Sequence, residues 1–104
     1  MKVTKPLKGH ENANARVEYT YHDQGNELVC IDLISYNTLV ATITPGIGES
    51  LIIQPKGQYW DHRLYTATTA KHISWFLKQE APNASYKKFR RAAERNHTLT
   101  VPAT

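Results

Sequence analysis

Four short segments rich in branched and aromatic side chains, each bounded by turn residues, most constrain what this chain folds into. The first segment alternates strictly, with Val17, Tyr19 and Tyr21 on one side and charged or polar residues on the other. Such alternation is typical of a half-buried strand. Gly, Pro, Asn and Asp residues separate the segments, as they do between antiparallel strands. The sequence therefore predicts strands over residues 16–22, 27–35, 39–44 and 50–54.

The second segment, ELVCIDLIS, is apolar on both sides apart from Asp32. This composition predicts a central strand that is covered on both faces. We expect Asp32 to lie at a strand end or to be satisfied by a hydroxyl or a basic group. Cys30 is interpreted as a small buried apolar side chain. Because it is the only cysteine, no internal disulfide can form.

Beyond the fourth segment, the pattern changes from strand to helix. Residues 59–65 are rich in aromatic side chains and favour a fifth strand or an extended crossing segment. Thr68 and Thr69 are each able to cap a helix, because a threonine hydroxyl accepts a hydrogen bond from a free backbone amide. Pro82 disfavours helical geometry in the residue before it, so this helix should end near residue 80.

A second helix is predicted over residues 86–96, with Asn83 or Ser85 as its cap. Strands followed by helices indicate an α+β domain. We therefore expect an antiparallel sheet of four to five strands followed by two C-terminal helices that pack on one face.

The length of 104 residues suits one domain, since a chain of this size buries enough surface for one core. We expect a single α+β domain over residues 16–97 and a C-terminal tail over residues 98–104. Residues 1–15 are polar and contain Pro6 and Gly9, which predicts a flexible N-terminal arm. No apolar run approaches the ~20 residues needed to cross a bilayer, and no signal peptide is recognisable, so we expect a cytoplasmic location.

The net charge of +4 is concentrated in the second predicted helix. Residues 87–95 contain five basic residues and one acid, and the rest of the chain has as many basic as acidic residues. On a helical projection, four basic side chains lie opposite the apolar side; we call them the basic ridge: Lys87, Lys88, Arg91 and Arg95. Such a ridge is suited to a phosphate backbone or an acidic protein surface. The alternative is a solvated helix face that serves solubility.

The first predicted helix carries one large aromatic side chain off its apolar stripe. Trp75 points away from that stripe and shares a face with Lys71 and Lys78. An indole between two lysines is suited to stacking on a base and to attracting a phosphate. The alternative is that the second helix or a partner subunit covers Trp75, and the second of these would make the protein a homodimer.

The histidines and carboxylates give no support for an enzyme. Asp61 and His62 are neighbours, so they would point to opposite faces of a strand. His62 and His72 are ten residues apart with a helix start between them, and no short histidine spacing supports a metal site. We therefore predict a protein without catalytic residues, metal or cofactor, with a small enzyme as the least favoured alternative.

Two segments, SYNTLVATI at residues 35–43 and YWDHRLYTATTAKHISWFL at residues 59–77, resemble a known pattern. The pattern occurs in small uncharacterised proteins of bacteriophages and mobile elements of low-GC Gram-positive bacteria. The matching residues are Ser35, Tyr36, Thr38, Val40, Ala41, Thr68, Thr69, Lys71, His72, Phe76 and Leu77. The resemblance covers about half of the predicted domain, leaves the N-terminal segment and the basic helix outside, and implies no catalytic residues.

What the resemblance implies is a phage or mobile-element setting in a bacterial host cell. Phage proteins of this size commonly act by binding DNA, RNA or components of host defence. The resemblance therefore leads us to expect a non-enzymatic protein that binds a host protein or nucleoprotein complex, such as an anti-CRISPR inhibitor. A direct nucleic-acid-binding protein is the second expectation.

Overall fold

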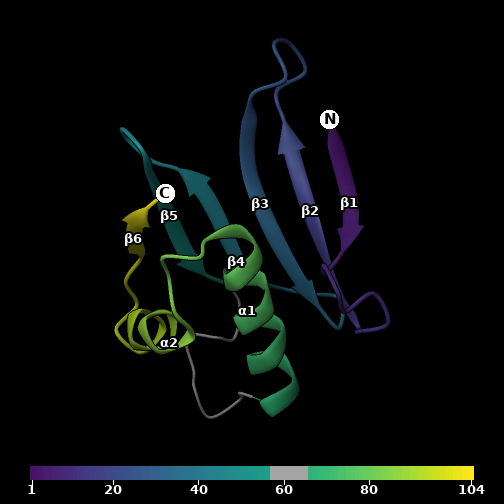
Figure 1. The fold of residues 1–104 in the computed structure, drawn as a ribbon, viewed down its shortest axis with the longest axis vertical. Helices are drawn as coiled ribbons and strands as arrows, with labels where there is room; N and C mark the ends of the chain where they lie inside the picture. Colours follow the sequence, from purple (N-terminus) through teal and green to yellow (C-terminus); the bar gives the residue numbers. More distant parts are fainter. Residues whose placement is uncertain (57–65) are drawn as a thin grey trace.

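Six strands form one antiparallel sheet in the part of the chain that the structure describes, residues 1–56 and 66–104. In this computed structural model, each strand pairs with its neighbours along the chain (Figure 1). The strands are β1 (Lys2–Pro6), β2 (Ala15–Tyr21), β3 (Leu28–Ser35), β4 (Thr38–Pro45), β5 (Ser50–Pro55) and β6 (Leu99–Pro102). The α+β class is confirmed, with more strands than predicted. The expectation of a strand over residues 59–65 lies outside the described residues.

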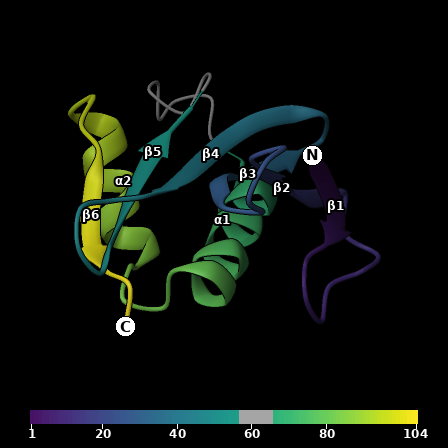
Figure 2. The same ribbon diagram turned by 90° about the horizontal axis from the view of Figure 1, so that it is seen from above.

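Both helices lie on the same face of the sheet, as predicted (Figure 2). α1 spans Ala67–Glu80 and packs against β3, whereas α2 spans Tyr86–Glu94 and packs against β5 and β6. Ser85 caps α2, as one of the two sequence alternatives predicted, because its hydroxyl accepts a hydrogen bond from the backbone N–H of Lys88 at 3.2 Å.

The cap of α1 differs from the expected Thr68 or Thr69. Thr66 has extended backbone geometry, and its hydroxyl accepts a hydrogen bond from the backbone N–H of Thr69 at 3.1 Å. Thr68 and Thr69 therefore lie within the first turn of the helix. Three nearby threonines made the cap ambiguous in the sequence, since each has the same hydroxyl acceptor.

The hydrophobic core lies between the helices and one face of the sheet. Val17, Leu33 and Ala41 are paired across β2, β3 and β4, so their side chains form one buried row. The next row and the helices supply most of its other large side chains, which are Ile31, Ile43, Ile53, Ile73, Phe76, Leu77 and Phe89. These residues follow the period of two in strands and the spacing of three and four in helices that the sequence showed.

β3 is covered on one face, not on both as expected. Cys30 and Asp32 lie on the face away from the helices and are half-buried. Asp32 is satisfied as predicted, since the Thr42 hydroxyl donates a hydrogen bond to its carboxylate at 2.7 Å. The apolar run was misleading because the open face of an antiparallel sheet tolerates moderately apolar side chains, which pack beside those of the neighbouring strands.

The N-terminal segment is part of the sheet, which corrects the flexible arm predicted over residues 1–15. Lys2–Pro6 forms β1 and pairs with β2, and the Leu7 side chain that follows is fully buried. β1 was missed because it lies at the edge of the sheet, where lysines and Pro6 are well tolerated and weaken the strand signal.

The C-terminal segment likewise forms a strand, which corrects the tail predicted over residues 98–104. Leu99 and Val101 of β6 face the core, and Thr100 between them is exposed. β6 pairs with β5 and forms the other edge of the sheet. Four residues are too few for periodicity alone to identify a strand with certainty.

Candidate anion-binding surface

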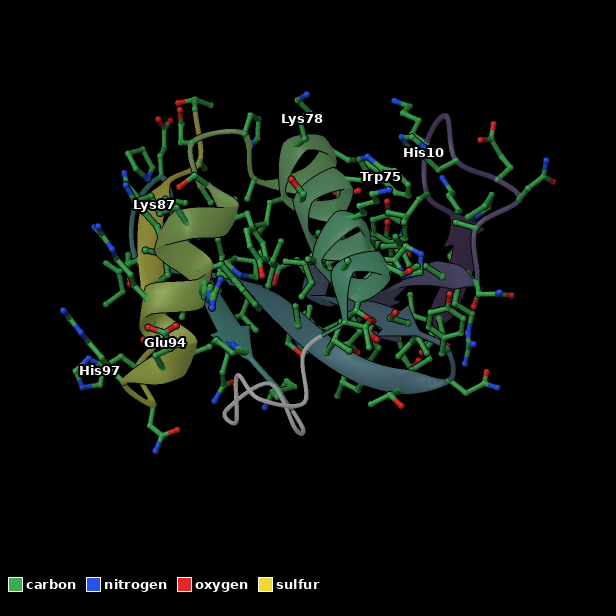
Figure 3. The ribbon with its side chains drawn as sticks, turned by 90° about the horizontal axis from the view of Figure 1, so that it is seen from below. His10, Trp75, Lys78, Lys87, Glu94 and His97 are labelled. Atoms are coloured by element: carbon green, nitrogen blue, oxygen red, sulfur yellow. The ribbon has the colours of Figure 1, made fainter. Side chains whose placement is uncertain are left out.

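α2 separates its apolar and basic side chains as the sequence predicted. Phe89, Ala92 and Ala93 are buried against the sheet and α1. All four residues of the basic ridge are exposed. Lys87 lies near the N-terminal end of α2 on its outer side, and His97 follows the C-terminal end (Figure 3).

Three members of the basic ridge line one pocket beside the chain that leads into β6. Lys88, Arg91 and Arg95 are three to seven residues apart, so they lie along one stripe of the helix. The pocket measures about 230 Å³, and its other lining residues are Ala92, His97, Thr98 and Leu99. Lys87 does not line it. The tertiary structure therefore extends the predicted ridge into a pocket that includes part of the supposed tail.

A regular helix C-terminus fixes the shape of this pocket. Asn96 has a positive φ of 54°, and its backbone N–H donates to the carbonyl of Ala93 at 3.2 Å. The backbone N–H of His97 reaches back to the carbonyl of Ala92 at 2.8 Å. These two bonds form a Schellman motif, which turns the chain back along the helix and satisfies its last carbonyls. The residues after the helix are thereby held against its basic stripe.

No carboxylate neutralises the basic ridge among the residues that the structure describes. Arg90 pairs with Glu94 at 3.1 Å, across the spacing of four residues at which opposite charges attract on a helix. Glu94 does not line the pocket. The ion pairs found elsewhere in the described chain involve the N-terminus, Lys2 and Arg16, none of which belongs to the ridge. The ridge is therefore a surface of exposed, uncompensated positive charge.

The ridge also opposes the stability of its own helix. Lys87 and Lys88 occupy the first turn of α2, where the helix dipole favours acids, and that turn contains no acid. Lys87 and Arg91 are four residues apart, as are Arg91 and Arg95, and like charges at this spacing repel one another. Only the two arginines near the C-terminal end are placed favourably for the dipole. The arrangement is not explained by helix stability.

Trp75 is half-buried, and the loop between β1 and β2 covers it instead of α2. The imidazole of His10 stacks on the indole with ring centroids 3.5 Å apart and planes 7° from parallel (Figure 3). One face of Trp75 is thus occupied by the chain itself. Lys78 and Lys71 are exposed, and Lys78 joins Trp75, His10, Lys8 and Gln79 around a hollow of about 220 Å³. The stacking role predicted for Trp75 is therefore weakened, together with the reason to expect a homodimer through it.

The two segments that carry the resemblance meet in the core. The Ser35 hydroxyl of β3 lies 2.8 Å from Nδ1 of His72 and 3.4 Å from the Thr69 hydroxyl of α1. Burial lowers the pKa of His72 below the usual 6.5, and the nearby His10 lowers it further. Ser35 and His72 are each only 2% exposed, so a substrate has no access to the pair. We interpret this serine–histidine pair as a structural bond between β3 and α1.

The described residues show neither a metal site nor a helix that spans a membrane. Within residues 1–56 and 66–104, no three histidine, cysteine or acidic side chains gather as metal ligands would. Neither described helix is long and apolar enough to cross a membrane. The absence of catalysis remains a prediction, since His62 and Asp61 lie outside the described residues.

His10, His97 and Thr98 are the residues that sequence reasoning missed. His10 and Thr98 lie in the segments interpreted as an arm and a tail, and His97 is the last residue of the predicted domain. One sequence signal pointed to the segment that contains His97 and Thr98. Leu99 and Val101 alternate with polar residues directly after the basic helix, which is typical of a strand. No local signal connects His10 with Trp75, since the two are far apart in the sequence.

Comparison with known proteins identifies one family. No curated protein and no solved structure matches the chain. The model of DUF8033, a family of unknown function, matches residues 1–91. The matched region extends from β1 through most of α2 and includes Lys87, Lys88 and Arg91. Since the match spans most of its length, the chain belongs to the DUF8033 family.

Proposed function

We propose that this protein is a non-enzymatic binding module that docks its basic ridge on an anionic surface of a host protein or nucleoprotein complex. The observation that carries the proposal is the exposed, uncompensated charge of Lys87, Lys88, Arg91 and Arg95 on one side of α2. The rest of the fold supports this role, since α2 is anchored to the sheet by Phe89 and presents the ridge rigidly to solvent. Such a surface attracts polyanions over several ångströms and orients them before contact.

A defence inhibitor of the anti-CRISPR type is the most specific form of this proposal. Its support is the resemblance to phage and mobile-element proteins. Nucleases of host defence present acidic protein faces and the phosphates of the nucleic acid that they bind, and a basic helix is able to dock at either. Direct binding to DNA or RNA is the second candidate, favoured by the pocket beside the ridge.

Charge reversal on α2 tests the proposal. A tagged protein should capture a defined partner from a bacterial host lysate, and the Lys88→Glu/Arg91→Glu/Arg95→Glu variant should lose at least tenfold of that capture, because attraction becomes repulsion. Parallel captures with and without nuclease treatment show whether the partner is a protein or contains nucleic acid.

Lys71→Glu/Lys78→Glu is the matched control on α1. Both lysines are exposed, so the control changes the net charge without changing the ridge. We expect it to retain capture. An α2 variant that remains folded and captures the same partner as the wild type would show that the ridge is not the docking surface. Loss of capture in the control alone would move the site to the Trp75 side of α1.

A further inference from the structure

We propose that the pocket between α2 and the start of β6 is a phosphate site that takes one phosphodiester group of a nucleic-acid backbone. Lys87 and the outer side of α2 would hold the neighbouring phosphates. This inference rests on the proposed function and makes nucleic acid the anionic surface that the ridge meets. The family match assigns no ligand, so the assignment depends on the pocket and on the length and charge of the ridge.

The pocket presents donors without an opposing acid. Lys88, Arg91 and Arg95 contribute cationic N–H groups, and His97 and Thr98 add an imidazole and a hydroxyl. Among residues 1–56 and 66–104, no aspartate or glutamate lines it. Phosphate oxygens are acceptors, and arginine matches them with two parallel N–H groups, which makes these contacts short and specific in geometry. Threonine hydroxyls are common additional contacts to backbone phosphates.

The pocket is also built before any ligand arrives. The Schellman hydrogen bonds from Asn96 and His97 hold the returning chain against the helix. Pairing of Leu99 with Ile53 of β5 fixes the far end of this short connection. The hollow of about 230 Å³ is open to solvent, and one water needs at least ~10–15 Å³ of such space, so a phosphate group fits. Little ordering of the backbone is therefore needed on binding.

The length of the ridge fits a strand of phosphates better than a single acidic side chain. A helix rises ~1.5 Å per residue, so Lys87 and Arg95 are separated by about 12 Å along α2. One nucleic-acid strand advances ~3.4 Å per nucleotide, so the ridge is about three nucleotides long. Repulsion within the ridge would be relieved by such a row of anions. A bound row of phosphates would therefore offset the repulsion between like charges four residues apart in α2.

The same geometry makes sequence-independent binding the expected mode. The pocket residues reach phosphates from a helix that lies on the sheet, and Trp75, the aromatic side chain expected to stack on bases, is already stacked on His10. Contacts restricted to phosphates position a protein on nucleic acid but carry no base information. We therefore expect similar affinities for unrelated sequences.

Titration of a short labelled duplex and of the corresponding single strand with the full-length protein tests the site. Fluorescence anisotropy over a salt series should show log affinity falling linearly with log salt, with a slope of about −0.9 per contacted phosphate in the duplex. Arg91→Gln and Arg95→Gln should each lower the affinity about tenfold and reduce the slope by about one. Lys71→Gln, an equal charge change on α1, should have a much smaller effect.

Two further variants separate a pocket from diffuse charge. Thr98→Val changes no charge and should lower the affinity several-fold, because a donor to phosphate is lost. Arg95→Lys keeps the charge and should bind more weakly than wild type, because an ammonium cannot form the paired N–H contacts. Wild-type affinity in both variants would contradict the assignment of the pocket as a phosphate site. Equal losses of affinity in Arg95→Gln and Lys71→Gln would contradict it as well.

Absence of binding at low salt would also overturn the phosphate site, but it would not by itself contradict docking through α2. A nuclease-resistant protein partner that is lost on charge reversal of the ridge would support the proposed function and exclude a phosphate backbone as the ligand. If the ridge variants kept both nucleic-acid binding and partner capture, the phosphate site and the proposed function would both be contradicted.

Discussion

The buried Ser35–His72 pair shows at the residue scale how this chain joins its sheet to its first helix. The 2.8 Å bond to Ser35 partly satisfies an imidazole that burial would otherwise penalise. Burial also keeps His72 neutral, since the pKa of its ring is lowered below 6.5. The histidine is therefore a polar element of the core whose favourable state depends on pH.

We expect the protein to lose stability on acidification through the titration of His72. Because the folded pKa lies below the unfolded value of 6.5, the unfolded state takes up the proton first. The contribution is complete above pH 6.5 and falls as the pH decreases from 6.5 towards the lowered folded pKa. Urea unfolding at a series of pH values measures this slope.

His72→Gln is the comparison, since glutamine is polar and does not titrate. The variant should be less stable at neutral pH, because the fit to Ser35 is altered, by roughly 1–3 kcal/mol. Its stability should depend less on pH than that of the wild type below 6.5. Parallel pH profiles for the two proteins would contradict the assigned role of His72.

At the scale of elements, the basic side chains of α2 lower the stability of the helix that carries them. Its first turn carries two lysines where the dipole favours acids, and its ridge repels itself. The helix is retained because Phe89 and its neighbouring alanines are buried and because both ends are capped. Packing thus holds a helix whose surface residues disfavour it.

Lys87→Glu should therefore stabilise the protein while weakening binding. The change places an acid in the first turn and an opposite charge four residues from Arg91, which together contribute about 1 kcal/mol. A gain of this size raises the Tm of a domain of this length by roughly 4–8 °C. Thermal unfolding followed by circular dichroism measures it.

Lys71→Glu is the control for this stability gain. Lys71 lies beyond the first turn of α1, and no charged residue lies three or four positions away on either side. We expect its effect to stay within about 0.5 kcal/mol. A lower stability in Lys87→Glu would show that Lys87 makes a stabilising contact and would remove the argument from helix electrostatics.

At the scale of the whole molecule, both ends of the chain form the edges of the sheet. β1 and β6 flank the four strands that the sequence identified. Each of the two edge strands also holds a neighbouring loop segment in place. β1 leads into the loop that covers Trp75, and the segment before β6 lines the phosphate pocket. The two helices alone would therefore not reproduce the candidate site.

Val101→Ala tests whether β6 is part of the folded domain. Val101 is only 5% exposed, so removal of its methyl groups should lower the free energy of unfolding by about 2 kcal/mol. Thr100→Ala, on the exposed side of the same strand, should change it by less than about 0.5 kcal/mol. If neither substitution changed the free energy of unfolding in urea, the segment would instead be a loose tail.

The sequence by itself determined the four inner strands, the two helices and the basic ridge. Each depends on residues close in the chain: alternation in strands, spacing of three and four in helices, a capping hydroxyl and the run of charge. Ser85 and the Arg90–Glu94 pair were predictable for the same reason.

Only the tertiary structure decided which strands form the edges of the sheet and which residues form the pocket. β1 and β6 gain their stability from neighbours already in the sheet, so their short, lysine- and proline-containing sequences carry little signal of their own. The pairings of His10 with Trp75 and of Ser35 with His72 join residues far apart in the chain. The ridge became part of a pocket through both local and long-range contacts: the Schellman bonds turn the chain back after α2, and the pairing of β6 with β5 holds the segment that contains Thr98 in place.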